Sequence, residues 1–141
     1  VVAGLVRVIE RMPPHSPLRA KYVLQLQDMA AALAPLQGSD GLWKPGLLDG
    51  ADYPLSEISG SAFFSYAMAY GVNHGLLPRR IYEPIIQKAW AGMISHIYAD
   101  GRLGRIQPVG TAPGPLAETT SYVYGVGGFL LAGSEIYRTA K

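Results

Sequence analysis

Apolar residues recur three or four positions apart in five stretches of the chain, and this spacing places them on one face of a helix. In the first stretch the spacing is carried by Leu5, Val8, Ile9 and Met12, after which three prolines end the helix. The five predicted helices span residues 1–12, 17–36, 59–74, 78 or 84 to 98, and 119–139. The pattern therefore predicts an all-α fold.

The third and fourth predicted helices differ in how much of their surface is apolar. Residues 59–74 alternate glycine and alanine with phenylalanine and tyrosine on nearly every side, which is typical of a helix buried all round. The next helix carries Glu83, Gln87 and Lys88 among its apolar residues. We expect this amphipathic helix to pack outside its predecessor.

Two long segments, residues 42–56 and 100–118, are rich in glycine and proline and have no sustained period. We interpret both as loops, the first with a short strand pair. Connections of this length are uncommon in a small helical domain unless they carry function.

A short sequence motif is repeated where each of the two loops begins. Asp40-Gly41-Leu42 and Asp100-Gly101-Arg102-Leu103 each follow a long helix, at an offset of 60 residues. Repeats of an outer helix, a loop and an inner helix close into an α/α toroid, of which five helices supply only a part. A compact orthogonal bundle fits the periodicity equally well, and the long loops favour the toroid.

Composition narrows the class of protein. Hydrophobic residues make up 49% of the 141 residues, which is enough for a core, and the formal charge of +2 is spread along the chain. We therefore expect no nucleic-acid partner. No apolar run approaches the roughly 18 residues of a membrane span, so we expect a soluble protein that does not bind a membrane.

The sequence offers no metal-binding or redox motif. It has no cysteine, and His15, His74 and His96 lie without metal-ligand spacing, so we expect neither metal nor cofactor. The lack of cysteine leaves the compartment open between cytoplasm and periplasm. The chain begins in a helical pattern without methionine, which suggests a piece of a longer protein rather than a signal peptide.

Several motifs in consistent order resemble the second half of glycoside hydrolase family 105. They are DGLW at 40–43, EISGSAFFSYA at 57–67, YGVNHGLL at 70–77, YEP at 82–84, KAW at 88–90, DGRLG at 100–104, QPVG at 107–110 and YGVGGFLLAGSE at 124–135. The resemblance covers roughly residues 38–138 and implies a partial (α/α)6 toroid of helical hairpins, with long loops at the barrel mouth.

The resemblance also implies an activity. Enzymes of that family remove unsaturated galacturonyl or glucuronyl residues that polysaccharide lyases leave on pectin-type oligosaccharides. An aspartic acid protonates the vinyl ether, water adds, and the hemiketal opens, unlike the usual two-carboxylate displacement. The family's principal catalytic aspartates lie in the amino-terminal half of the barrel. We therefore name no catalytic residue in residues 1–141, which we take as the carboxyl-terminal part, and expect the chain alone to be inactive.

Two residues of the first loop are candidates for binding an unsaturated uronic-acid oligosaccharide. The indole of Trp43, on a glycine-flanked loop, suits stacking on a sugar face, and its alternative role is to cap the core. Lys44 suits a uronate carboxylate, and its alternative is a solvated lysine.

Further candidates lie at the starts of the two small-residue helices. Glu57, Ser59 and Ser61 stand where helix amide groups favour a carboxylate. Their alternative role is capping, with Ser56 or Ser59 as N-cap.

Gln107 lies on the second loop, and Tyr122 and Tyr124 precede the last inner helix. All three are candidates for lining a substrate pocket at the barrel mouth. Loop bracing and core packing are their alternatives. Residues 125–128 look like a phosphate loop, but tight helix packing explains their glycines better.

Two other functions stay open. The chain fits a non-catalytic helical scaffold or glycan-binding module, and a local carboxylate at Asp40, Asp100 or Glu118 fits a related reaction. A partial ring also leaves its inner helices exposed along open edges, which predicts a homo-oligomer or an apolar seam.

Overall fold

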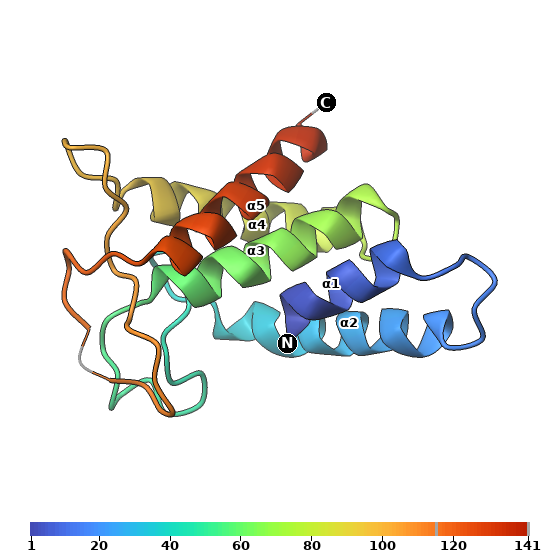
Figure 1. The fold of residues 1–141 in the computed structure, drawn as a ribbon, viewed down its shortest axis with the longest axis horizontal. Helices are drawn as coiled ribbons and strands as arrows, with labels where there is room; N and C mark the ends of the chain where they lie inside the picture. Colours follow the sequence, from blue (N-terminus) through green and yellow to red (C-terminus); the bar gives the residue numbers. More distant parts are fainter. Residues whose placement is uncertain (115, 141) are drawn as a thin grey trace.

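The computed structural model describes residues 1–114 and 116–140, which form five α-helices and one 3-10 turn (Figure 1). The elements are α1 (Val2–Arg11), α2 (Arg19–Leu33), η1 (Ala34–Leu36), α3 (Ile58–Asn73), α4 (Arg79–Ile94) and α5 (Val123–Thr139). In these residues β-pairing is limited to two isolated bridges, Trp43 with Glu57 and Ile97 with Leu103. The all-α prediction is confirmed, and the predicted strand pair is reduced to a single bridge.

The ends of two helices differ from the prediction. The last helix begins at Val123 rather than at residue 119, because the loop pairs there instead and the Ile106 amide donates to the Thr120 carbonyl. The fourth helix ends at Ile94 rather than Tyr98, since the Tyr98 amide donates to Arg102 in a tight turn.

The helices form an inner and an outer layer, and α3 is the central helix of the inner layer. It packs against α1 and α5, with which it forms the inner layer, and against α2 and α4, which lie outside (Figure 1). Most residues of α3 are buried, as predicted. A Cβ atom at Gly128 would lie 3.1 Å from the Phe63 ring, so the backbone of α5 lies close against α3.

Helix α1 shows how the buried face is chosen. Its buried residues are Val2, Leu5, Val6 and Ile9, which lie on one stripe. Val8 was predicted on that stripe but is 41% exposed. At about 100° per residue, Val8 lies about 160° around the helix from the buried Val6, which turns its side chain out of the stripe.

The two turns formed by the repeated Asp-Gly motif have the same local structure. Gly41 and Gly101 both have a positive φ, of 86° and 81°. In each turn the aspartate before the glycine accepts a bond from the amide two residues on, at 3.1 Å for Asp40 and 3.0 Å for Asp100. Both turns lead into the mouth loops, residues 37–57 and 95–122, which gather at one end of the helices (Figure 1).

An apolar seam lies on one edge of the inner layer. On α5, Val123 is 89% exposed and Leu130 is 62% exposed, and Leu131 is exposed beside them. Self-association through this edge stays a prediction.

Candidate functional site

The start of α3 joins the two mouth loops through Glu57. The side chain is buried, and its carboxylate accepts the amides of Ser59 at 2.9 Å and Gly60 at 2.7 Å, which makes Glu57 the N-cap. The same carboxylate accepts the amide of Gln107 at 3.2 Å, so it also holds the second loop. The predicted N-cap, Ser56 or Ser59, is therefore wrong. Glu57 lies between these two serines, and its longer side chain reaches the amides of both Ser59 and Gly60.

Between the two loops lies a hollow of about 180 Å³, here called the mouth hollow. It is lined by Trp43, Lys44, Pro45, Leu47, Glu57, Ser59, Gly60, Phe63, Phe64 and Gln107. Five of the eight candidate substrate-binding residues, Trp43, Lys44, Glu57, Ser59 and Gln107, thus meet at one place. The turns that carry Trp43 and Gln107 lie at the same end of the helices, as a toroid requires.

Of the other three candidates, Tyr122 is 40% exposed at the start of α5 and does not line the mouth hollow, whereas Ser61 and Tyr124 lie behind its wall. Ser61 is fully buried, donates to the Glu57 carbonyl at 2.6 Å and accepts the Trp43 amide at 2.9 Å. Tyr124 donates its hydroxyl to the Gln107 carbonyl at 2.5 Å and accepts the Ser59 hydroxyl. These positions suit support of the lining rather than direct contact with a ligand.

Trp43 takes the core position that was its alternative role. The side chain is 1% exposed, its indole Nε1 donates to the Leu33 carbonyl at 2.8 Å, and its ring meets Phe64 edge-on at 5.5 Å. The predicted stacking needs an open ring face, which this packing does not offer.

The polar residues that line the mouth hollow are Lys44, Glu57, Ser59 and Gln107. The Lys44 ammonium donates to the Gly50 carbonyl at 3.0 Å, and two of its three N–H donors are left for a ligand. In the described part of the chain, Gln107 Oε1 is the one buried side-chain oxygen or nitrogen without a partner. Leaving such an atom unpaired costs roughly 1–3 kcal/mol, and Gln107 is among the residues that line the mouth hollow.

A cluster around Arg105, which the sequence did not point to, fixes the loops from outside. The Arg105 guanidinium donates to both carboxylate oxygens of Glu118 and, at 3.1 Å, to the Ser56 hydroxyl, which donates to Asp40. The hydrogen bond from Arg105 lowers the pKa of the Glu118 carboxyl. Arg105 has a φ of 50°, which is rare for a residue other than glycine.

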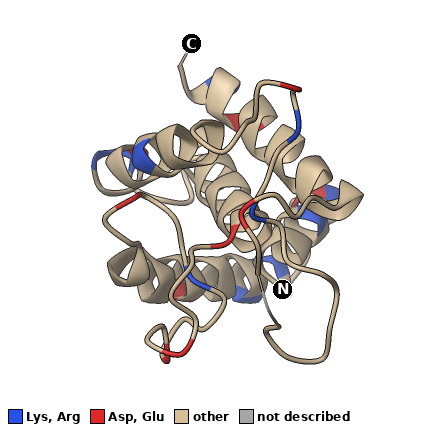
Figure 2. Ribbon diagram, turned by 90° about the vertical axis from the view of Figure 1, so that its left-hand side faces the viewer, with Lys and Arg blue, Asp and Glu red and all other residues tan. Residues whose placement is uncertain are grey.

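The local carboxylates considered for catalysis lie outside the mouth hollow. Asp40 and Glu118 belong to the Arg105 cluster, and Asp100 is exposed beside Arg102. Seen from the loop end, the positions of acidic and basic residues are scattered along the ribbon (Figure 2). Residues 1–114 and 116–140 contain no group of three metal-ligating side chains and no helix long and apolar enough to cross a membrane.

Comparison with known proteins identifies the family. The sequence model of Glycosyl Hydrolase Family 88 matches residues 1–140. The chain belongs to glycosyl hydrolase family 88. A relative from Formosa agariphila named "Unsaturated 3S-rhamnoglycuronyl hydrolase" is 40% identical over 138 residues, which is 98% of this chain and 37% of the relative. This family 88 chain thus spans less than half the length of the relative.

Solved structures agree with the family assignment. A family 88 glycosyl hydrolase from Bacteroides vulgatus superposes with a TM-score of 0.92 at 36% identity, over 97% of this chain and 40% of that one. A possible member of family 105 from Salmonella enterica gives 0.81 at 29% identity, over 100% of this chain and 38% of that one. The resemblance to family 105 and the partial (α/α)6 toroid are confirmed, and the compact bundle is excluded.

Proposed function

We propose that this family 88 chain is the carboxyl-terminal part of a hydrolase that releases an unsaturated uronic acid from an oligosaccharide by hydration of the vinyl ether. The observation that carries the proposal is the mouth hollow, where Lys44, Ser59 and Gln107 converge within about 180 Å³. That volume is below the roughly 300–1,000 Å³ of sites for drug-sized ligands, so it suits a single sugar unit. The relative's name supports a glycuronyl unit linked to rhamnose.

Each polar residue has a role that follows from its position. The Lys44 ammonium pairs with the uronate carboxylate, because a cation beside an anionic sugar makes a charge-assisted hydrogen bond. Gln107 Oε1 accepts a sugar hydroxyl, which relieves its lack of a partner. Ser59 adds a hydroxyl at the start of α3.

The proton donor for the vinyl ether lies outside this chain in the proposal. Glu57 is the carboxylate that lines the mouth hollow, and three backbone amides already occupy its oxygens. Such a carboxylate suits a positioning residue rather than a proton donor. We therefore expect the chain to bind the substrate without converting it.

Calorimetric titration with an unsaturated glucuronyl-rhamnose disaccharide tests the proposal. We expect the chain to bind the disaccharide and Lys44→Met to weaken binding at least about fivefold, which corresponds to about 1 kcal/mol. Lys21→Met is the matched control, since Lys21 is exposed near the start of α2, at the end of the molecule away from the mouth loops (Figure 1). It should bind like the wild type.

Two results would overturn the proposal. Absence of binding, or equal binding by Lys44→Met, would remove the mouth hollow as the uronate site. Loss of the ultraviolet absorbance of the unsaturated sugar on incubation with the chain alone would show that the proton donor lies within it.

A further inference from the structure

Arg105 joins the two mouth loops from outside the mouth hollow. Its guanidinium donates to both carboxylate oxygens of Glu118 on the second loop and, at 3.1 Å, to the Ser56 hydroxyl on the first loop. The Arg105 side chain is 17% exposed, so it is largely shielded from water. Arg105 does not line the mouth hollow, and it therefore acts on a bound ligand only through other residues.

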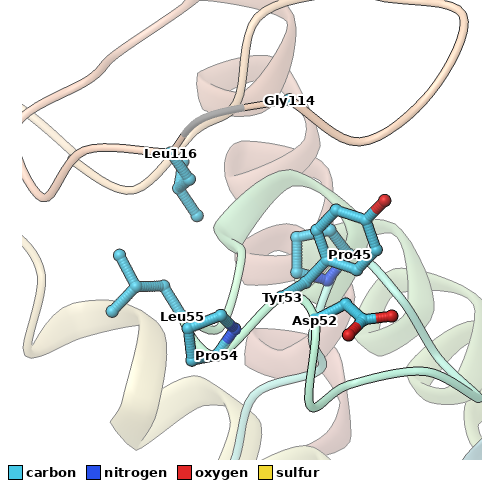
Figure 3. Close-up of a pocket in the computed structure, with 7 residues that line it drawn as sticks. All are labelled: Pro45, Asp52, Tyr53, Pro54, Leu55, Gly114 and Leu116. Carbon is cyan, nitrogen blue, oxygen red and sulfur yellow. The ribbon is translucent and has the colours of Figure 1, made fainter.

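Apolar packing leaves the spacing of the two loops open beside this network. Leu55, next to Ser56, and Leu116, two residues before Glu118, line a hollow of about 180 Å³ between the loops (Figure 3). Side chains across such a gap lack the close contacts that resist movement of one loop against the other. Polar links therefore fix the spacing, and Arg105 supplies those on this side of the loops.

The backbone of Arg105 sets the path of the chain to Gln107, two residues further on. Its amide donates to the Glu118 carbonyl and its carbonyl accepts the Ile58 amide in the first turn of α3, both at 2.9 Å. The φ of 50° lies in a region that glycine enters freely and other residues rarely adopt. The bonds of the guanidinium hold Arg105 in this conformation, and so they also help to place Gln107 on the mouth hollow.

On the first loop the network reaches the backbone beside Lys44. The Ser56 hydroxyl donates to the Asp40 carboxylate, so the two ends of the first loop are tied together. Directly after Ser56, the Glu57 amide donates to the Trp43 carbonyl at 2.9 Å, and Lys44 follows Trp43 in the chain. A shift of Ser56 is therefore passed to the backbone that carries Lys44.

We propose that Arg105 is the positioning residue of the mouth hollow, which holds Lys44 and Gln107 at the separation that one uronate sugar bridges. This inference rests on the proposed function, which gives the uronate carboxylate to Lys44 and a sugar hydroxyl to Gln107. A fixed spacing strengthens binding because the two groups need not be ordered when the ligand arrives. Without the guanidinium both groups keep their chemistry and lose their alignment, so the affinity of the folded chain falls.

Arg105→Gly is the main test, because it removes the guanidinium while glycine adopts a φ of 50° without strain. In calorimetric titration with the unsaturated glucuronyl-rhamnose disaccharide, we expect this variant to bind about tenfold more weakly than the wild type. Arg102→Gly is the matched control, since Arg102 lies on the same loop, is 48% exposed and pairs with the exposed Asp100. It should bind like the wild type, and wild-type affinity in Arg105→Gly would overturn the inference.

A second variant separates positioning from stability. Urea denaturation gives the folded fraction of each variant, and titration where folding is complete leaves the affinity unchanged if Arg105 serves stability alone. Glu118→Gln breaks the ion pair at a side chain that is 52% exposed, so the fold tolerates the change. It should bind about threefold more weakly, and adding it to Arg105→Gly should cause no further loss, because both variants break one network. Wild-type affinity in Glu118→Gln, or fully additive losses, would contradict the inference, also where Arg105→Gly does not fold.

The two proposals fail separately, because NMR spectra of the free chain report on the loops without a ligand. In Arg105→Gly the backbone amides of Gln107 and of the distant Lys44 should both shift, whereas in Arg102→Gly the Lys44 amide should not. These shifts without any binding of the disaccharide would refute the proposed function and leave Arg105 as the link between the loops. An unshifted Lys44 amide in Arg105→Gly would overturn the inference even where Lys44-dependent binding is found.

Discussion

Glu57 holds together the start of α3 and both mouth loops, and its removal should show how far the site depends on one side chain. The carboxylate accepts the amides of Ser59, Gly60 and Gln107, and it is 4% exposed, so water cannot replace it easily. Glu57→Ala removes the N-cap, which contributes about 1 kcal/mol. It also removes the charged acceptor of the Gln107 amide, worth about 1.5–3 kcal/mol. We expect the free energy of unfolding to fall by about 3 kcal/mol.

Urea denaturation followed by circular dichroism measures this loss. With a slope of about 2 kcal/mol per molar urea, the midpoint should fall by about 1.5 M. Glu83→Ala is the matched control, because Glu83 pairs with Arg79 on the surface of α4 and such pairs contribute only about 0.5 kcal/mol. A loss below about 0.5 kcal/mol in Glu57→Ala, with the Gln107 amide unshifted in NMR spectra, would refute the role of Glu57 as the joint.

Three further predictions concern packing, pH and association. Gly128→Ala should lower the melting temperature, because the added Cβ would lie 3.1 Å from the Phe63 ring. Gly127→Ala should raise the free energy of unfolding by about 1 kcal/mol, because no atom lies within 4 Å of its added Cβ. The reverse order of the two variants in thermal melts would contradict the α3–α5 packing. Because Arg105 lowers the pKa of Glu118, the unfolded chain takes up the proton first as the pH falls, so the stabilisation is complete above about pH 4.5 and is lost below it. Urea midpoints between about pH 5 and 3 should therefore fall less in Arg105→Leu than in the wild type, and parallel curves would argue against the ion pair. The exposed face of α5 predicts self-association, and Leu130→Glu should shift sedimentation velocity profiles toward the monomer. A monomeric wild type would contradict this prediction.

The helices could be predicted because each buries a stripe or a whole surface whose spacing is local. The ends of the helices were harder to predict. Thr120 lies in the loop because its carbonyl accepts the Ile106 amide, and no local pattern encodes a contact between residues 14 positions apart. The exposure of Val8 was also not predictable from the local pattern. Apolar residues lie on both sides of Leu5 around α1, and the packing of α1 on α2 and α3 decides which of them are buried.

Some residues of the candidate site could likewise be predicted from the sequence, whereas the positions of others depend on the fold. Glu57 and Gln107 belong to motifs of the family and Lys44 follows another such motif, and the structure places all three on the mouth hollow. The burial of Trp43 depends on the Leu33 carbonyl and the Phe64 ring, which only the fold places around it. Arg105 was missed because its partner Ser56 is 49 residues away.

The most direct test of the account is a crystal structure of the chain soaked with the unsaturated glucuronyl-rhamnose disaccharide. We predict the uronate in the mouth hollow, with its carboxylate within hydrogen-bond distance of Lys44 Nζ and a hydroxyl on Gln107 Oε1. Density for the sugar away from residues 43–60 and 107, or loops that carry Trp43 and Gln107 to opposite ends of the helices, would contradict it.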